Sequence, residues 1–167
     1  MIMKKLFYVC AAAVLLAACN SKDKNEPETP GVSFAKANYF EAVGTNTVPN
    51  VEGEDKDQPF SLDNVRVEAV ITTDTTLDIN LYGIKFSSKM PVSIDMVIPG
   101  AKYTRTAEKI IFDGEGIIPT MGGNPFDRYV INDLSGTITT DALVFSNSYG
   151  TYAGCTYAGK ITNIKER

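Results

Sequence analysis

Apolar and polar residues alternate through most of this chain after Val32, a period of two that is typical of β-strands with one buried face. Three runs show it most clearly: Val65–Ile71, Leu77–Leu81 and Val92–Ile98. Segments rich in β-branched and aromatic residues predict further strands at Ser33–Val43, Glu108–Phe112, Arg128–Thr139, Ala142–Ser148 and Tyr152–Ile164. No helical stripe competes with this pattern, so we expect an all-β fold of about eight strands.

The residues between these runs predict antiparallel neighbours. Thr73–Thr75 is too short for a parallel crossover, which needs a dozen or more residues, and therefore predicts a hairpin. Pro99–Gly100 and Thr140–Asp141 predict two further turns. The alternation of apolar and polar residues shifts by one position at Tyr82–Gly83, which predicts a β-bulge or a strong bend. Asp78, Asp95 and Asp133 fall on the polar faces of their strands, where we expect them to face solvent.

A single antiparallel domain over residues 32–167 accounts for these strands. Two longer connections, Gly44–Pro59 and Ile118–Phe126, do not mark domain boundaries, because the strands beside them could not form a stable sheet alone. About eight strands in a meander either close into an up-and-down barrel or divide into a two-sheet β-sandwich. The strand pattern leaves both architectures open.

Three segments, Leu77–Phe86, Met90–Pro99 and Leu134–Phe145, resemble the calycin-like (lipocalin-like) barrel domain of small bacterial lipoproteins. The likeness covers Val65–Lys160, and the chain departs from that family at the acidic connection Gly44–Pro59. The resemblance implies an up-and-down barrel able to hold a ligand. It implies no ligand identity and no site residues.

The N-terminus carries an export signal. Lys4 and Lys5 precede an apolar run that ends at Leu16, and this run is shorter than the roughly 20 residues that cross a bilayer. Leu16-Ala-Ala-Cys19 resembles the lipobox of bacterial lipoproteins, which implies that residues 1–18 are removed and that Cys19 becomes a lipid anchor. An ordinary secretory signal with an incidental cysteine is the alternative.

Residues 19–31 form a predicted flexible tether, because Asn20–Gly31 offers no core residue and contains two prolines. The charged residues after Cys19 resemble the export signal of surface-displayed lipoproteins in some Gram-negative anaerobes. The alternative interpretation of these residues is a solvated spacer that faces the periplasm. We therefore expect a lipid-anchored protein of the outer membrane, on its periplasmic or its cell-surface face.

The composition argues against several kinds of chemistry. The chain has no histidine, the usual general base at neutral pH and the commonest zinc ligand. Cys155 has no disulfide partner once Cys10 is removed with the signal and Cys19 is lipidated. We therefore expect Cys155 to be a small buried residue of the last strand. Without residues 1–18 the net charge becomes −6, which disfavours nucleic acid as a partner. We expect no enzyme activity, no cofactor and no metal site.

Two groups of residues remain as candidates for binding. Tyr149, Tyr152 and Tyr157 could stack on a ligand, although cross-strand packing also explains them. The acidic residues Glu52, Glu54, Asp55 and Asp57 form either a solvated loop, a calcium site or, least expected, a catalytic carboxylate pair. The sequence therefore favours non-enzymatic binding of a small ligand or a partner. A structural or accessory subunit of a cell-surface assembly is the alternative.

Overall fold

The computed structural model describes residues 33–49 and 59–167. The signal peptide, Cys19, the tether and the acidic residues 52–57 lie outside the described residues, so the expectations for them stay predictions. No helix among the residues described has the length and the apolar character needed to cross a membrane.

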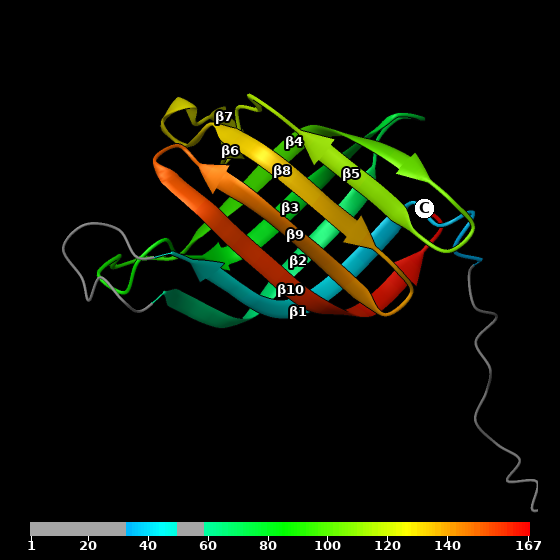
Figure 1. Cartoon of the computed structure of the whole chain (residues 1–167), viewed down its shortest axis with the longest axis horizontal. Helices are drawn as coiled ribbons and strands as arrows, with labels where there is room; N and C mark the ends of the chain where they lie inside the picture. The colour runs from blue at the N-terminus through cyan, green and yellow to red at the C-terminus, as the bar shows by residue number, and fades with distance from the viewer. Residues whose placement is uncertain (1–32, 50–58) are drawn as a thin grey trace, which may run out of the picture. The chain divides into compact units, whose positions relative to one another are not determined.

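Eight antiparallel strands close into one up-and-down barrel (Figure 1). Each strand pairs with the next along the meander, β3 pairs with β4, and β10 returns beside β1 to complete the wall. The strands are β1 (Tyr39–Val48), β2 (Phe60–Ile71), β3 (Thr76–Ile84), β4 (Ile94–Arg105), β5 (Ile110–Gly114), β8 (Ile131–Ile138), β9 (Ala142–Tyr149) and β10 (Tyr152–Lys165). The barrel prediction is confirmed, and the sandwich alternative is wrong.

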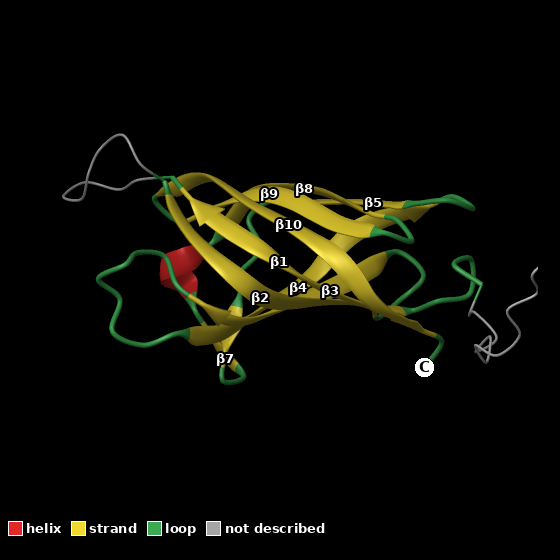
Figure 2. Ribbon diagram, turned by 90° about the horizontal axis from the view of Figure 1, so that it is seen from below, coloured by secondary structure: helices red, strands yellow, loops and turns green. Residues whose placement is uncertain are grey.

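The connection between β5 and β8 holds three short elements. These are β6 (Thr120–Met121), β7 (Asn124–Pro125) and the 3-10 helix η1 (Asp127–Tyr129). β6 pairs with β4 at Val97, and η1 lies at the end of the barrel where β9 turns into β10 (Figure 2). The predicted connection Ile118–Phe126 therefore contains a small hairpin.

The structure confirms two turns and corrects a third. Hairpins join β2 to β3 and β8 to β9, as Thr73–Thr75 and Thr140–Asp141 predict. The turn predicted at Pro99–Gly100 is wrong, because β4 runs through both residues without a break. The first strand also differs, since it begins at Tyr39 and continues to Val48, inside the predicted connection.

Two β-bulges shape the β3–β4 pair, and each places a glycine opposite an aspartate. Gly83 and Gly100 both have a φ of +69°, in the left-handed region that favours glycine. The Asp95 carboxylate accepts a hydrogen bond from the Gly83 N–H at 2.7 Å, and Asp78 accepts one from Gly100 at 2.8 Å. The register of the pair shifts at both places. The bulge predicted at Tyr82–Gly83 is confirmed.

Inward-facing side chains from every wall strand fill the barrel. Two aromatic rings lie directly over glycines. A Cβ on Gly136 would lie 2.2 Å from Cζ of Phe112, and one on Gly159 would lie 2.3 Å from the Tyr157 hydroxyl. These glycines therefore provide the space in which large rings cross the interior.

One end of the barrel, called here the closed end, is covered by the first described residues. Phe34 is buried there, with its ring centroid 5.3 Å from that of Phe40 on β1. The Arg105 guanidinium, from β4, donates to the carbonyl oxygens of Ala35 and Ala37 and so holds this segment in place. The opposite end, called here the loop end, carries the connections 85–93, 115–130 and 150–151.

Candidate functional site

The structure places the three candidate tyrosines in different surroundings. Tyr149 and Tyr157 are buried inside the barrel, with exposed fractions of 0% and 1%, whereas Tyr152 is half-buried. Tyr157 lies deeper in the barrel, where its hydroxyl donates to the Val65 carbonyl on β2 at 3.1 Å. Tyr149 and Tyr152 lie at the loop end, at the two sides of the β9–β10 turn. Of the three, only Tyr152 offers an accessible ring.

Aromatic rings gather around Tyr152 at the loop end. Phe86 lies parallel to Tyr129 and to Tyr152, with centroids 4.7 and 5.5 Å apart, and Tyr149 meets Phe86 at 5.0 Å. Phe126 adds a further ring against Tyr129. We call Phe86, Phe126, Tyr129, Tyr149 and Tyr152 the aromatic cluster. Phe86 and Tyr149 are buried, whereas Phe126, Tyr129 and Tyr152 are half-buried and offer ring surface and two phenol hydroxyls, a combination suited to stacking.

Behind this cluster, three polar side chains are buried within the barrel. Asn46 is 1% exposed, Asn147 is 2% exposed and Tyr149 is fully buried. Within the part of the chain that the structure describes, neither amide nor the Tyr149 hydroxyl has a hydrogen-bond partner. We call these three side chains the interior polar patch. A buried polar group left unpaired costs about 1–3 kcal/mol, so the patch is unusual in an otherwise apolar interior.

The two side chains that influence the Tyr149 hydroxyl, Cys155 and Asn147, are uncharged at neutral pH. Burial raises the pKa of Tyr149, and the adjacent Cys155 adds to the rise, whereas the Asn147 amide opposes it without a hydrogen bond of normal geometry. Burial also raises the pKa of the Cys155 thiol to about 12, so this cysteine is a small inert residue, as predicted. At neutral pH these groups all remain neutral.

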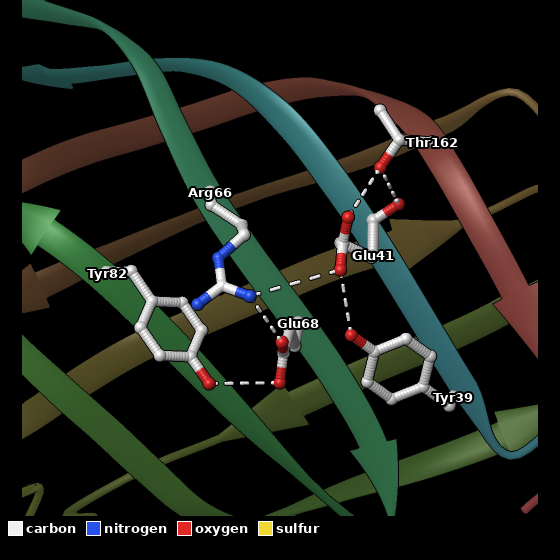
Figure 3. A network of polar contacts seen from close by, with 6 residues as sticks. All are labelled: Tyr39, Glu41, Arg66, Glu68, Tyr82 and Thr162. Carbon is white, nitrogen blue, oxygen red and sulfur yellow. Dashed lines mark hydrogen bonds and ion pairs between the residues drawn. The ribbon is translucent and has the colours of Figure 1, made fainter.

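A polar network lies on the outer wall, across β1, β2, β3 and β10 (Figure 3). Glu68 is only 8% exposed and accepts hydrogen bonds from Arg66 at 2.9 Å and from the Tyr82 hydroxyl at 3.0 Å. Glu41, its cross-strand partner, accepts from the Tyr39 hydroxyl at 2.9 Å. The Thr162 hydroxyl on β10 donates to Glu41 at 3.1 Å, so the network joins four neighbouring strands through two carboxylates and one guanidinium.

Burial alone would raise the pKa of Glu68. The neighbouring hydroxyls of Tyr39 and Tyr82 and the charge of Arg66 outweigh burial, so the pKa lies below its ordinary value of 4.5. Burial and the nearby carboxylates raise the pKa of both tyrosines in turn. Glu68 is thus held as a carboxylate by hydrogen-bond donors, an arrangement that stabilises the wall.

A hollow of about 380 Å³ lies in the outer wall beside the end of β5. Its carboxylates are already engaged in part, because Glu115 accepts from the Asp133 N–H at 2.8 Å and Asp133 accepts from the Ser148 hydroxyl at 3.1 Å. Among the described residues, no three side chains of metal-binding type come together. The hollow is lined by Gly100, Lys102, Asp113, Gly114, Glu115, Ile117, Asp133 and Leu134.

Comparisons with protein-family models, with curated proteins and with solved structures find no match to this chain.

Sequence reasoning found part of the candidate site and missed the rest. It selected Tyr149 and Tyr152 but not Phe86 or Tyr129, which reach the same end of the barrel from distant connections. It passed over Asn147, although the inward parity of Leu143, Phe145 and Tyr149 places this residue on the buried face of β9. An amide at an inward position of a strand was the available signal.

Proposed function

We propose that this protein is a lipid-anchored lipoprotein of the bacterial cell envelope, whose calycin-like barrel binds a small ligand at the loop end without catalysing a reaction. The observation that carries the proposal is the aromatic cluster, with the interior polar patch behind it. Ligand sites in barrels commonly combine apolar and aromatic surface with a few placed polar groups. The loop end has both.

The two barrel ends differ in how they are covered. The first described residues lie over the closed end, where Arg105 donates to the carbonyl oxygens of Ala35 and Ala37. The aromatic cluster lies at the other end, which supports the loop end as the place where a ligand is met.

Mass spectrometry of the protein purified from membranes tests this function. The full chain is extracted in mild detergent and denatured, and the released small molecules are identified and quantified. We expect a defined compound with the parent protein and about two- to tenfold less with Tyr152→Ala, because one stacking ring is lost. Tyr103→Ala is the matched control, since Tyr103 lies on β4 toward the closed end. No compound, or equal loss in both variants, would contradict ligand binding at the loop end.

The anchor and its orientation need a separate measurement. Cys19→Ser should move the protein from the membrane fraction to the supernatant, because the lipidated thiol is removed. Protease treatment of intact cells then distinguishes the cell-surface face from the periplasmic face. A Cys19→Ser protein that stays in the membrane fraction would overturn the proposed anchor.

Exposed apolar residues favour a second candidate, an accessory subunit of a cell-surface assembly. Val92 is 63% exposed and Ile118 is 46% exposed, and both lie in connections at the loop end. Crosslinking in intact cells should then recover one stoichiometric partner, which Val92→Lys releases. Val144→Lys is the control, because Val144 is 42% exposed on the outer wall of β9. An unchanged partner with Val92→Lys would argue against this surface.

A further inference from the structure

The interior polar patch leaves hydrogen-bonding capacity unused inside the barrel. Two carboxamides and one phenol, from Asn46, Asn147 and Tyr149, make no hydrogen bond of normal geometry to the described residues, although Asn147 and the Tyr149 hydroxyl influence each other, and each side chain is at least 98% buried. Native proteins pair nearly all such groups, either within the chain or with a bound molecule. Among the described residues, the one other buried side-chain atom without a partner is Nε of Arg105, whose guanidinium already donates to two backbone carbonyls, so unused hydrogen-bonding capacity is concentrated in the patch.

Strand register brings the three side chains to one area of the inner wall. Asn46 on β1 is the cross-strand partner of Tyr157 on β10, and Asn147 on β9 is the partner of Cys155. Cys155 and Tyr157 are two residues apart and both point inward, so they connect the two amides across β10. Asn147 and Tyr149 are two residues apart on β9 and are both buried, so their side chains share the inner face of this strand.

We propose that the interior polar patch binds one small, uncharged molecule that both donates and accepts hydrogen bonds, such as a compound with a carboxamide or hydroxyl group. This inference rests on the proposed function and adds the chemical class of the ligand. Each carboxamide offers a carbonyl acceptor and an N–H donor, and the phenol can serve as either.

The surroundings exclude a charged ligand. Apart from the patch, the core side chains packed inside the barrel are apolar. The Arg105 guanidinium lies at the closed end, where it donates to Ala35 and Ala37, and the buried Glu68 belongs to the outer wall, where Arg66 and Tyr82 engage it. An ionised group placed among them would lose its hydration without gaining a counter-charge. The large rings of Phe145 and Tyr157, stacked with centroids 5.2 Å apart, fill the neighbouring interior and limit the ligand to a small size.

The stability of the ligand-free protein distinguishes a binding role for the amides from a structural one, because removing a structural amide should lower the Tm. If Asn46 and Asn147 serve a ligand, the ligand-free protein gains nothing from them, and leucine of similar size should suit the apolar interior better. We expect Asn46→Leu and Asn147→Leu to raise the Tm of the ligand-free protein by about 2–4 °C each. Asn163→Leu, at a half-buried position of the same strand pair as Asn46, is the control and should not raise it.

Binding is tested with three probes of defined chemistry on the full chain in detergent. Acetamide is uncharged and both donates and accepts, acetate has the same shape with a charge, and xenon reports apolar cavities. Side-chain amide resonances of Asn46 and Asn147 are followed by NMR. We expect acetamide to shift both in a saturable manner, acetate to leave them unchanged, and Asn147→Leu to weaken acetamide binding at least about tenfold.

The outcomes separate this inference from the proposed function. Unshifted amide resonances with acetamide, an equal response to acetate, or xenon binding in its place would overturn the assigned ligand class. Long-lived water bound to the amides without any probe response would do the same. If the compound released from native protein is retained by Asn147→Leu but lost by Tyr152→Ala, loop-end binding stands and the interior site fails. If acetamide binds but native protein carries no compound, the interior site stands and the proposed function fails.

Discussion

At the residue scale, the interior depends on glycines that give space to aromatic rings. Gly136 lies beneath Phe112, and an added methyl group would overlap the ring. We expect Gly136→Ala to lower the free energy of unfolding by about 1–3 kcal/mol, the usual cost of overpacking a core. Phe112→Leu should relieve the part of this loss that the ring causes, whereas the part caused by the Phe145 Cβ, 2.7 Å from the added methyl group, should remain. A double-mutant cycle measured by denaturant unfolding checks the coupling, and additive effects would contradict the proposed overlap.

A second residue-scale prediction concerns the buried carboxylate of the outer wall. Because the pKa of Glu68 in the fold is below 4.5, its contribution to stability is present above that pH and is lost as the pH falls toward the folded-state pKa. Glu68→Gln should cost about 1–3 kcal/mol at neutral pH and flatten the pH profile of stability below 4.5. Chemical unfolding over this pH range measures both effects.

Glu108→Gln is the matched control for that experiment, since it removes the same charge from an exposed position. It should leave neutral-pH stability nearly unchanged, as surface substitutions generally do. If both variants follow the acid profile of the parent, the hydrogen-bond donors around Glu68 do not stabilise its charged form.

At the scale of elements, the two bulges define the course of the β3–β4 pair. Gly100 has a positive φ, and no atom lies within 4 Å of the place where its Cβ would be. Gly100→Ala should therefore cost about 1–2 kcal/mol through backbone conformation alone. Gly100→Asn should cost less, because asparagine tolerates this region better. Thermal unfolding of both variants checks this order, and equal losses would point to a cause other than φ.

The same bulges explain where sequence reasoning about elements succeeded and failed. At Gly83 the parity of the apolar residues changes, and this local signal predicted the bulge. At Pro99–Gly100 the residue types are equally typical of a turn, and the strand continues only because β3 pairs on both sides of the irregularity. Asp78, Asp95 and Asp133 lie on the outer faces of their strands as expected, with Asp95 and Asp133 exposed and Asp78 half-buried, but the hydrogen bonds that Asp78 and Asp95 accept from the bulge glycines were not predicted. Such roles depend on the partner strand, which alternation does not specify.

At the scale of the whole molecule, alternation predicted the fold class and the number of wall strands but not the site. Closure requires β10 to meet β1, a pairing between strands at opposite ends of the described chain. The aromatic cluster likewise unites Phe86, Tyr129 and Tyr152 from three distant segments. Asn46 fell within the predicted connection Gly44–Pro59, and only the strand pairing and the burial of its side chain show that it points inward.

Buried tyrosines in several parts of the barrel make its stability depend on pH in the alkaline range. Tyr39 and Tyr82 belong to the polar network on the outer wall. The Tyr157 hydroxyl donates a hydrogen bond from β10 to β2, and Tyr149 lies at the loop end. Burial is the largest cause of the raised pKa of each. Because the folded-state pKa exceeds the ordinary value of 10.0, their contribution to stability is complete below that pH and is lost as the pH rises.

We therefore expect these tyrosines to ionise together with unfolding at alkaline pH. Tyrosinate absorbance and far-ultraviolet circular dichroism, recorded in one titration, should change in the same cooperative step, whereas in denaturant the absorbance should follow the ordinary value of 10.0. Tyr157→Phe should lower stability at neutral pH, because the hydrogen bond to Val65 is lost, and should make the fall in stability above pH 10.0 less steep, because one buried ionisable phenol is removed. Complete ionisation with unchanged dichroism would mean that the phenols titrate in an intact barrel, and burial would then not control their ionisation.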